Sequence, residues 1–191
     1  MKETELNESK LEINENAENA GGHDHVVIKV LGLVFGIIAA IVIVSVIISK
    51  TLLPVYRYNN AAKYASERDY ATATQRLLGL DYKDSQEKYG EYACKAAEEF
   101  YNSNDMDQAI EYFRYAYSSN IEKYQIEAIV YCYIIQPESV NYSEDIAETV
   151  LTEADSLYES GNTDKAKVYY NYAKDSKNED IKAQAESRLS E

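Results

Sequence analysis

The pattern of hydrophobic and polar residues divides the chain into three parts. Residues 1–25 are mostly polar, residues 30–48 are uncharged and largely apolar, and from residue 55 onward apolar positions recur with the spacing of amphipathic helices. Of seven glycines, four lie at or before residue 36, and only two prolines occur, so the last part has few helix breakers. The pattern predicts an all-α protein in which a single transmembrane helix precedes a series of antiparallel helix pairs.

The uncharged run contains 19 residues, from Val30 to Ile48, and lies between Lys29 and Lys50. As a helix it would be about 28 Å long, which matches a hydrocarbon core of roughly 30 Å. A cleaved signal peptide is the less favoured alternative, because the run exceeds the usual apolar region of about 7–15 residues and lacks a small-residue cleavage site. We therefore predict an uncleaved membrane anchor over residues 26–53.

Small residues recur every fourth position within this anchor, at Gly32, Gly36 and Ala40. Such a stripe lets a second helix backbone approach closely and predicts helix–helix association. Glycine and alanine are also common in membrane helices that do not associate, so a monomeric anchor is the alternative.

The seven acidic residues among residues 1–25 predict a disordered acidic tail, because this composition buries too little apolar surface to offset the entropy of ordering. The only histidines, His23 and His25, lie in this tail without the third and fourth ligands of a zinc site. We therefore predict no bound metal.

Three segments in the last part of the chain align on an alanine that follows a polar turn. They are residues 67–73, 103–109 and 160–166, which end at Ala73, Ala109 and Ala166. Upstream of each turn, a second small residue is found at Ala61, Ala97 or Ala154. A small residue on each of two antiparallel helices allows the helices to cross closely, so the pattern predicts three helical hairpins within residues 55–191.

The first two hairpin units are 36 residues apart and the next step is 57 residues, which predicts an additional helix over residues 122–136. A last amphipathic segment, residues 179–189, is expected to cover the end of the stack.

This arrangement resembles tetratricopeptide (TPR) repeats, whose period is about 34 residues. The stretch from Leu78 to Ser85 also resembles the L-G-x-Y-K-D-S connector of membrane-anchored helical-repeat proteins of Gram-positive bacteria. In that group a single membrane helix is followed by Leu-Pro and tyrosines, as at Leu53-Pro54 and Tyr56 here. The resemblance implies a TPR-like α-solenoid that lies outside the cytoplasm. In that group a basic or Cys-rich segment commonly precedes the membrane span, whereas this chain has an acidic tail. The basic residues that flank the span mildly favour a cytoplasmic location of the repeats instead.

Acidic and tyrosine side chains recur when the second and third hairpins are superimposed. The equivalent pairs are Glu91 with Glu148, Glu98 with Asp155, and Tyr101 with Tyr158. Since the first helix of each pair lines the concave side of a solenoid, these six residues predict a partner-binding groove for a protein or peptide with basic residues. The alternative is that acids recur by chance in an acidic domain and that the tyrosines only pack between repeats.

The chain has 33 acidic and 19 basic residues and a net charge of −14, which argues against nucleic acid as a partner. No arrangement of nucleophile and base can be assembled from the domain, so we expect neither catalysis nor a cofactor. Cys94 and Cys132 are either small buried residues or, in an oxidising compartment, a disulfide pair.

The sequence thus favours a membrane-anchored, non-catalytic interaction protein of the cell envelope. A structural component that self-assembles through its membrane helix or repeat ends is the alternative, and an enzyme or small-ligand sensor is the least favoured hypothesis.

Overall fold

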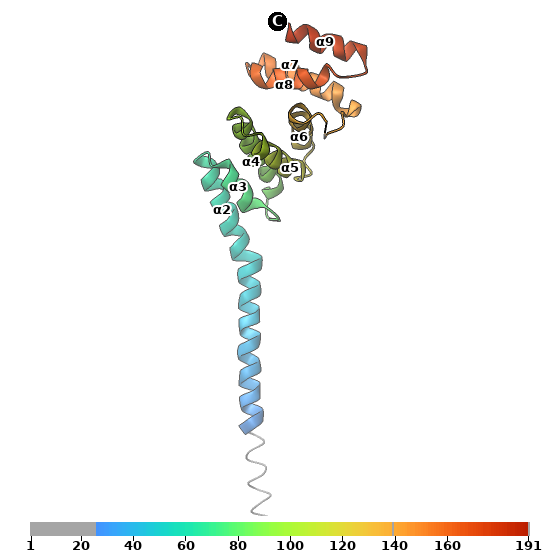
Figure 1. Ribbon diagram of the computed structural model, residues 1–191. Helices are drawn as coiled ribbons and strands as arrows, with labels where there is room; N and C mark the ends of the chain where they lie inside the picture. Colours follow the sequence, from blue (N-terminus) through green and yellow to red (C-terminus); the bar gives the residue numbers. More distant parts are fainter. Residues whose placement is uncertain (1–25, 139, 191) are drawn as a thin grey trace, which may run out of the picture. The chain divides into compact units, whose positions relative to one another are not determined.

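The computed structural model describes residues 26–138 and 140–190, and its chain forms two units, residues 1–53 and 54–191 (Figure 1). Within the described ranges the regular structure is entirely helical, as the hydrophobic pattern predicts. The predicted disordered tail and the two histidines lie outside the described residues.

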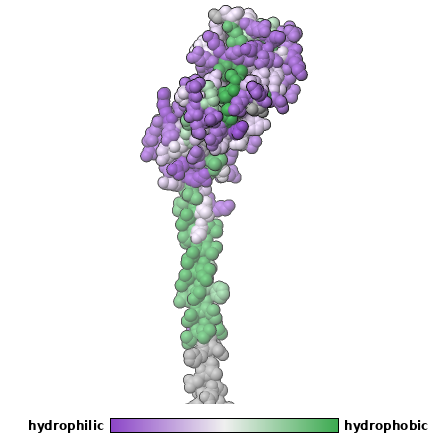
Figure 2. Space-filling model, in the orientation of Figure 1, coloured by the Kyte–Doolittle hydropathy of each residue, from purple (hydrophilic) through white to green (hydrophobic). Residues whose placement is uncertain are grey.

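The first unit contains the apolar helix, which is α-helical over residues 26–47 and continues as a short π-helix, η1 (Ile48–Leu52). It is long and apolar enough to cross a membrane. Its large side chains are exposed, and Figure 2 shows them as a hydrophobic surface along this helix. The hydroxyl groups of Ser45 and Ser49 donate hydrogen bonds to carbonyl oxygens one turn earlier, at 2.8 and 2.9 Å, so neither polar group is left unpaired.

The second unit consists of eight α-helices within the described residues. They are α2 (Leu53–Ser66, whose first residue belongs to the first unit), α3 (Tyr70–Leu77), α4 (Ser85–Asn102), α5 (Met106–Tyr117), α6 (Glu122–Ile135), α7 (Ala147–Glu159), α8 (Thr163–Ala173) and α9 (Glu179–Leu189). A short 3₁₀ helix, η2 (Glu144–Ile146), precedes α7. The predicted extra helix corresponds to α6, and the predicted last helix has the bounds of α9.

The three predicted hairpins contain turns of the same backbone geometry. The second residue of each turn is left-handed, with φ of 62° at Arg68, 64° at Asn104 and 84° at Gly161. The next residue in each turn donates its backbone N–H to the carbonyl five residues earlier: Asp69 to Tyr64 at 3.0 Å, Asp105 to Phe100 at 2.9 Å, and Asn162 to Leu157 at 2.8 Å. Such a bond satisfies one of the carbonyls left free at a helix end and reverses the chain. The polar turns seen in the sequence are therefore three copies of one local structure.

Close packing of the hairpins depends on the six alanines aligned in the sequence. Ala97, Ala154, Ala73, Ala109 and Ala166 have no exposed surface, and Ala61 is 1% exposed. Large aromatic side chains fill the space between hairpins: the fully buried Phe113 ring stacks on Tyr131, with centroids 4.6 Å apart. Much of the tyrosine content of the chain therefore serves packing.

The order of contacts in the stack changes at α6. Helix α4 packs against α3 and α5, and α6 packs against α5. The third hairpin then meets α6 mainly through its second helix, α8, and α9 in turn packs on α8. The connection between α6 and α7 is held by Tyr172 on α8, whose hydroxyl accepts a hydrogen bond from the Ser143 N–H and donates one to the Ser143 carbonyl. Helices α4 and α7 are therefore not consecutive members of one row.

Candidate partner-binding site

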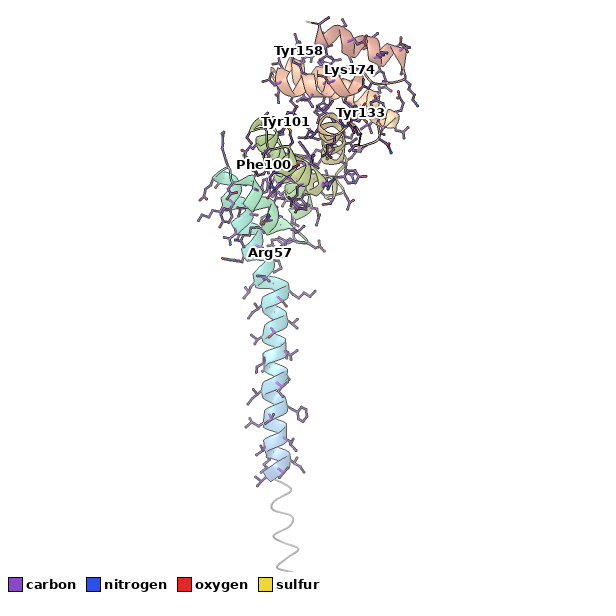
Figure 3. All side chains as sticks on the ribbon, viewed as in Figure 1. Arg57, Phe100, Tyr101, Tyr133, Tyr158 and Lys174 are labelled. Carbon is purple, nitrogen blue, oxygen red and sulfur yellow. The ribbon has the colours of Figure 1, made fainter. Side chains whose placement is uncertain are left out.

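The six residues predicted to line a groove lie on two helices. Glu91, Glu98 and Tyr101 are on α4, and Glu148, Asp155 and Tyr158 are on α7; Figure 3 labels both tyrosines. Glu148 is exposed, whereas Glu91 accepts a hydrogen bond from the Lys95 ammonium at 2.6 Å on its own helix. Tyr101 is half-buried and packs edge-on against Tyr131, with ring centroids 5.1 Å apart. These side chains thus differ in how far they are available to a partner.

Asp155 and Tyr158 are brought together by Arg188 from the last helix, α9. The Arg188 Nε lies 3.2 Å from Asp155 Oδ1, and its guanidinium lies 6.0 Å from the centre of the Tyr158 ring. Asp155 also accepts a hydrogen bond of 2.6 Å from the hydroxyl of the buried Tyr170. These contacts attach α9 to the third hairpin, a function that the recurrence of residues along the sequence did not reveal.

Glu98 belongs to an ion cluster that joins three helices. The Lys165 ammonium on α8 lies 2.8 Å from a carboxylate oxygen of Glu98 on α4 and 2.8 Å from one of Glu127 on α6. Glu127 is 8% exposed, and the side chains of Lys165 and Glu98 are 18% and 28% exposed. A cation shared by two carboxylates in this environment connects the second hairpin, α6 and the third hairpin.

Burial changes the proton affinities of this cluster. It raises the pKa of the Glu127 carboxyl, an effect that the charge of Lys165 opposes and that of Glu98 reinforces. Burial also disfavours the charged form of Lys165, but Glu127 and Glu98 outweigh it and raise the pKa of the ammonium to about 12. The adjacent Cys94 thiol has its pKa raised, chiefly by burial, and is therefore a poor nucleophile.

A polar pocket of about 290 Å³ lies beside the ion cluster. Helices α6, α7 and α8 line it with Lys123, Tyr124, Ile126, Glu127, Thr149, Glu153, Lys165 and Tyr169. Tyr169 is only 3% exposed, and its hydroxyl makes no hydrogen bond to any residue that the structure describes. We refer to these eight residues as the α6–α8 pocket. Sequence reasoning missed it because its residues come from separate helices without a common motif.

A second, more apolar pocket of about 330 Å³ includes Phe113, Arg114 and Tyr117 of α5 and Ala128, Ile129 and Cys132 of α6. Cys132 is partly exposed, Cys94 is buried, and both thiols are free. Among residues 26–138 and 140–190, no group of three or more His, Cys, Asp or Glu side chains is placed to hold a metal ion.

No protein family model, curated protein or solved structure matches this chain.

Proposed function

We propose that this chain is a membrane-anchored helical-repeat protein, of the TPR-like type, that binds other proteins at the cell envelope without catalysing a reaction. The observation that carries the proposal is the hairpin turn repeated at Arg68, Asn104 and Gly161. Repeated hairpins that stack side by side expose extended surfaces, which are suited to binding a polypeptide. The apolar helix supplies the proposed anchor, and we place the repeats outside the cytoplasm in accordance with the resemblance of the connector.

The charge of the domain supports a partner with basic residues. Residues 55–191 contain 26 acidic and 15 basic side chains, and Figure 2 shows a largely hydrophilic surface on this unit. An acidic surface increases the rate of encounter with a basic partner and disfavours acidic ones. Anchoring both molecules at one membrane would raise their effective concentration, so that weak contacts suffice.

The six predicted groove residues remain candidates for partner contact. They differ in whether they already bind another helix of the same chain, so they can be tested separately. Glu98 and Asp155 already hold Lys165 and Arg188, so charge reversal there would disturb packing between helices. Glu148 is exposed and lies on the first turn of α7. Glu148→Lys therefore tests the charge of the surface without breaking an ion pair that the structure describes.

Crosslinking in native membranes tests the proposed function. We expect the full chain to crosslink to a different protein, and we expect this product to be lost when residues 54–191 are deleted and reduced by Glu148→Lys. The same heterologous product from the anchor alone would contradict the proposal.

Self-assembly through the membrane helix is a second candidate function, favoured by the stripe of Gly32, Gly36 and Ala40. A Cβ atom added at either glycine would meet nothing within 4 Å, so this face is open to a second helix. Oligomers that persist after deletion of residues 54–191 and disappear with Gly36→Ile would support it. Oligomers unaffected by Gly36→Ile would exclude this face as the contact.

A further inference from the structure

We propose that the α6–α8 pocket binds the basic side chain of a lysine or arginine residue in a partner polypeptide. This inference rests on the proposed function and assigns a specific site to it. Three features of the pocket support this assignment: its excess of negative charge, a hydroxyl group without a partner among the described residues, and its size.

The lysines of the pocket are already neutralised. Lys165 is shared by Glu98 and Glu127 at 2.8 Å each, and Lys123 lies 3.1 Å from a carboxylate oxygen of Glu87. Neither ammonium is therefore available as the main partner of an anionic ligand. The cluster of Lys165 with its two carboxylates instead retains an excess of negative charge.

Glu153 adds a second negative charge. It is exposed on α7, it lines the pocket, and no described residue forms an ion pair with it. A cation that enters the pocket would thus meet the Glu153 carboxylate at the rim and the buried Glu127 carboxylate deeper inside. The electrostatic complement of such a site is positive.

Tyr169 provides the independent observation that points to a ligand. Its side chain is 97% buried and lines the pocket, yet its hydroxyl has no hydrogen-bond partner in the described part of the chain. This hydroxyl oxygen is not fully enclosed by protein, so a ligand in the pocket can reach it. The N–H group of an incoming ammonium or guanidinium would supply the missing donor.

The size of the pocket limits the ligand to a single side chain. A volume of about 290 Å³ lies at the lower end of the range for small-ligand pockets. The apolar stem of a lysine or arginine would pack against Ile126 and the ring of Tyr124, with the charged end toward Tyr169 and the carboxylates. A polypeptide partner is favoured over a free amine because the rest of its chain can use the acidic surface of residues 55–191.

The test uses the full chain in detergent micelles, with ¹³C-labelled tyrosine observed by nuclear magnetic resonance. Four capped pentapeptides are titrated, each with a central arginine, lysine, norleucine or glutamate between alanines, and n-butylamine, which has the same stem and single charge as a lysine side chain, is the free amine. We expect the arginine and lysine peptides to shift the Tyr169 resonance and the norleucine and glutamate peptides not to. The free n-butylamine lacks the peptide groups and is expected to bind at least fivefold more weakly than the lysine peptide.

Three variants locate the site, and in all of them binding is followed by the resonance of Tyr124, the other tyrosine that lines the pocket. Glu153→Gln and Tyr169→Phe are expected to weaken binding of the lysine peptide by about fivefold or more, since each removes one contact of roughly 1 kcal/mol. Tyr169→Phe keeps the buried ring and therefore the packing. Glu159→Gln, which removes an exposed carboxylate outside the pocket on the same helix, is the matched control and should leave binding unchanged.

Equal binding of the norleucine peptide, tighter binding of the glutamate peptide, or n-butylamine binding as tightly as the lysine peptide would each overturn the inference. No shift with any basic peptide would overturn it as well. The proposed function fails separately: it is contradicted if the anchor alone yields the heterologous crosslinked product, whatever the peptides do.

Discussion

Removal of the Lys165 ammonium is the sharpest perturbation of the folded domain. At 2.8 Å and an effective dielectric constant of about 20, each contact with Glu98 and Glu127 corresponds to about 6 kcal/mol of Coulomb energy. Desolvation of the ions, at several kcal/mol per ion, offsets most of this. Because Lys165→Met leaves the buried Glu127 carboxylate without its cation, we expect the free energy of unfolding near neutral pH to fall by about 3 kcal/mol.

The pH dependence of this loss can be derived from the proton affinity of Glu127. Burial already raises the pKa of this carboxyl, and removal of Lys165 raises it further. A carboxyl whose pKa is higher in the folded than in the unfolded protein binds more protons when folded, so stability decreases as pH rises through that range. The Lys165→Met variant should therefore recover stability as the pH falls below neutrality, more steeply than the original chain.

Urea unfolding of the full chain in detergent micelles, followed by far-ultraviolet circular dichroism, measures these effects. The double variant Lys165→Met with Glu127→Leu is the control, because it removes the buried charge together with its partner. It should lie within about 1 kcal/mol of the original chain and lose the additional pH dependence. A loss below about 1 kcal/mol in the single variant, with an unchanged pH profile, would show that solvent screens the cluster and would refute this reasoning.

Three further changes test the packing of the domain by the same unfolding measurement. Gly161→Ala should lower stability by about 1 kcal/mol because this residue has a φ of 84°, and an unchanged midpoint would contradict the importance of the left-handed turn. Gly90→Ala should cost about 1–3 kcal/mol, since its Cβ would lie 2.4 Å from a ring carbon of Tyr124, and a neutral effect would mean that this ring moves freely. Tyr170→Phe should cost about 1 kcal/mol by removing the 2.6 Å hydrogen bond to Asp155, and equal stability would show that water replaces it.

Local patterns in the sequence predicted the helices well. An uncharged run identified the apolar helix, and small residues beside polar turns identified the hairpins. Both could be recognised because each pattern is contained within a few dozen consecutive residues. Ala97 and Ala109, for example, are both fully buried on the two helices that flank a turn with a left-handed Asn104. The end of α6 followed from the proline after Gln136, and the bounds of α9 followed from its amphipathic spacing.

The candidate site was less accessible to sequence reasoning because it depends on contacts between distant helices. Lys165 is 67 residues from Glu98 and 38 residues from Glu127, and no spacing rule connects them. The superposition that suggested a groove assumed that the first helix of each hairpin, α4 or α7, lines one concave side, whereas α6 meets the third hairpin mainly through α8. The acidic residues that the superposition selected include two, Glu98 and Asp155, that hold helices of the same chain together.

Site-specific photocrosslinking in intact cells would reveal whether a basic segment of another protein occupies the α6–α8 pocket. A photoreactive residue in place of Thr149, on the wall of the α6–α8 pocket, is compared with one in place of Glu159, which is exposed on the same helix outside the pocket. We expect a product between Thr149 and a lysine- or arginine-containing segment of another envelope protein, reduced by Glu153→Gln and weak or absent at Glu159. Products of equal yield at both positions, or products that contain only this chain, would contradict it.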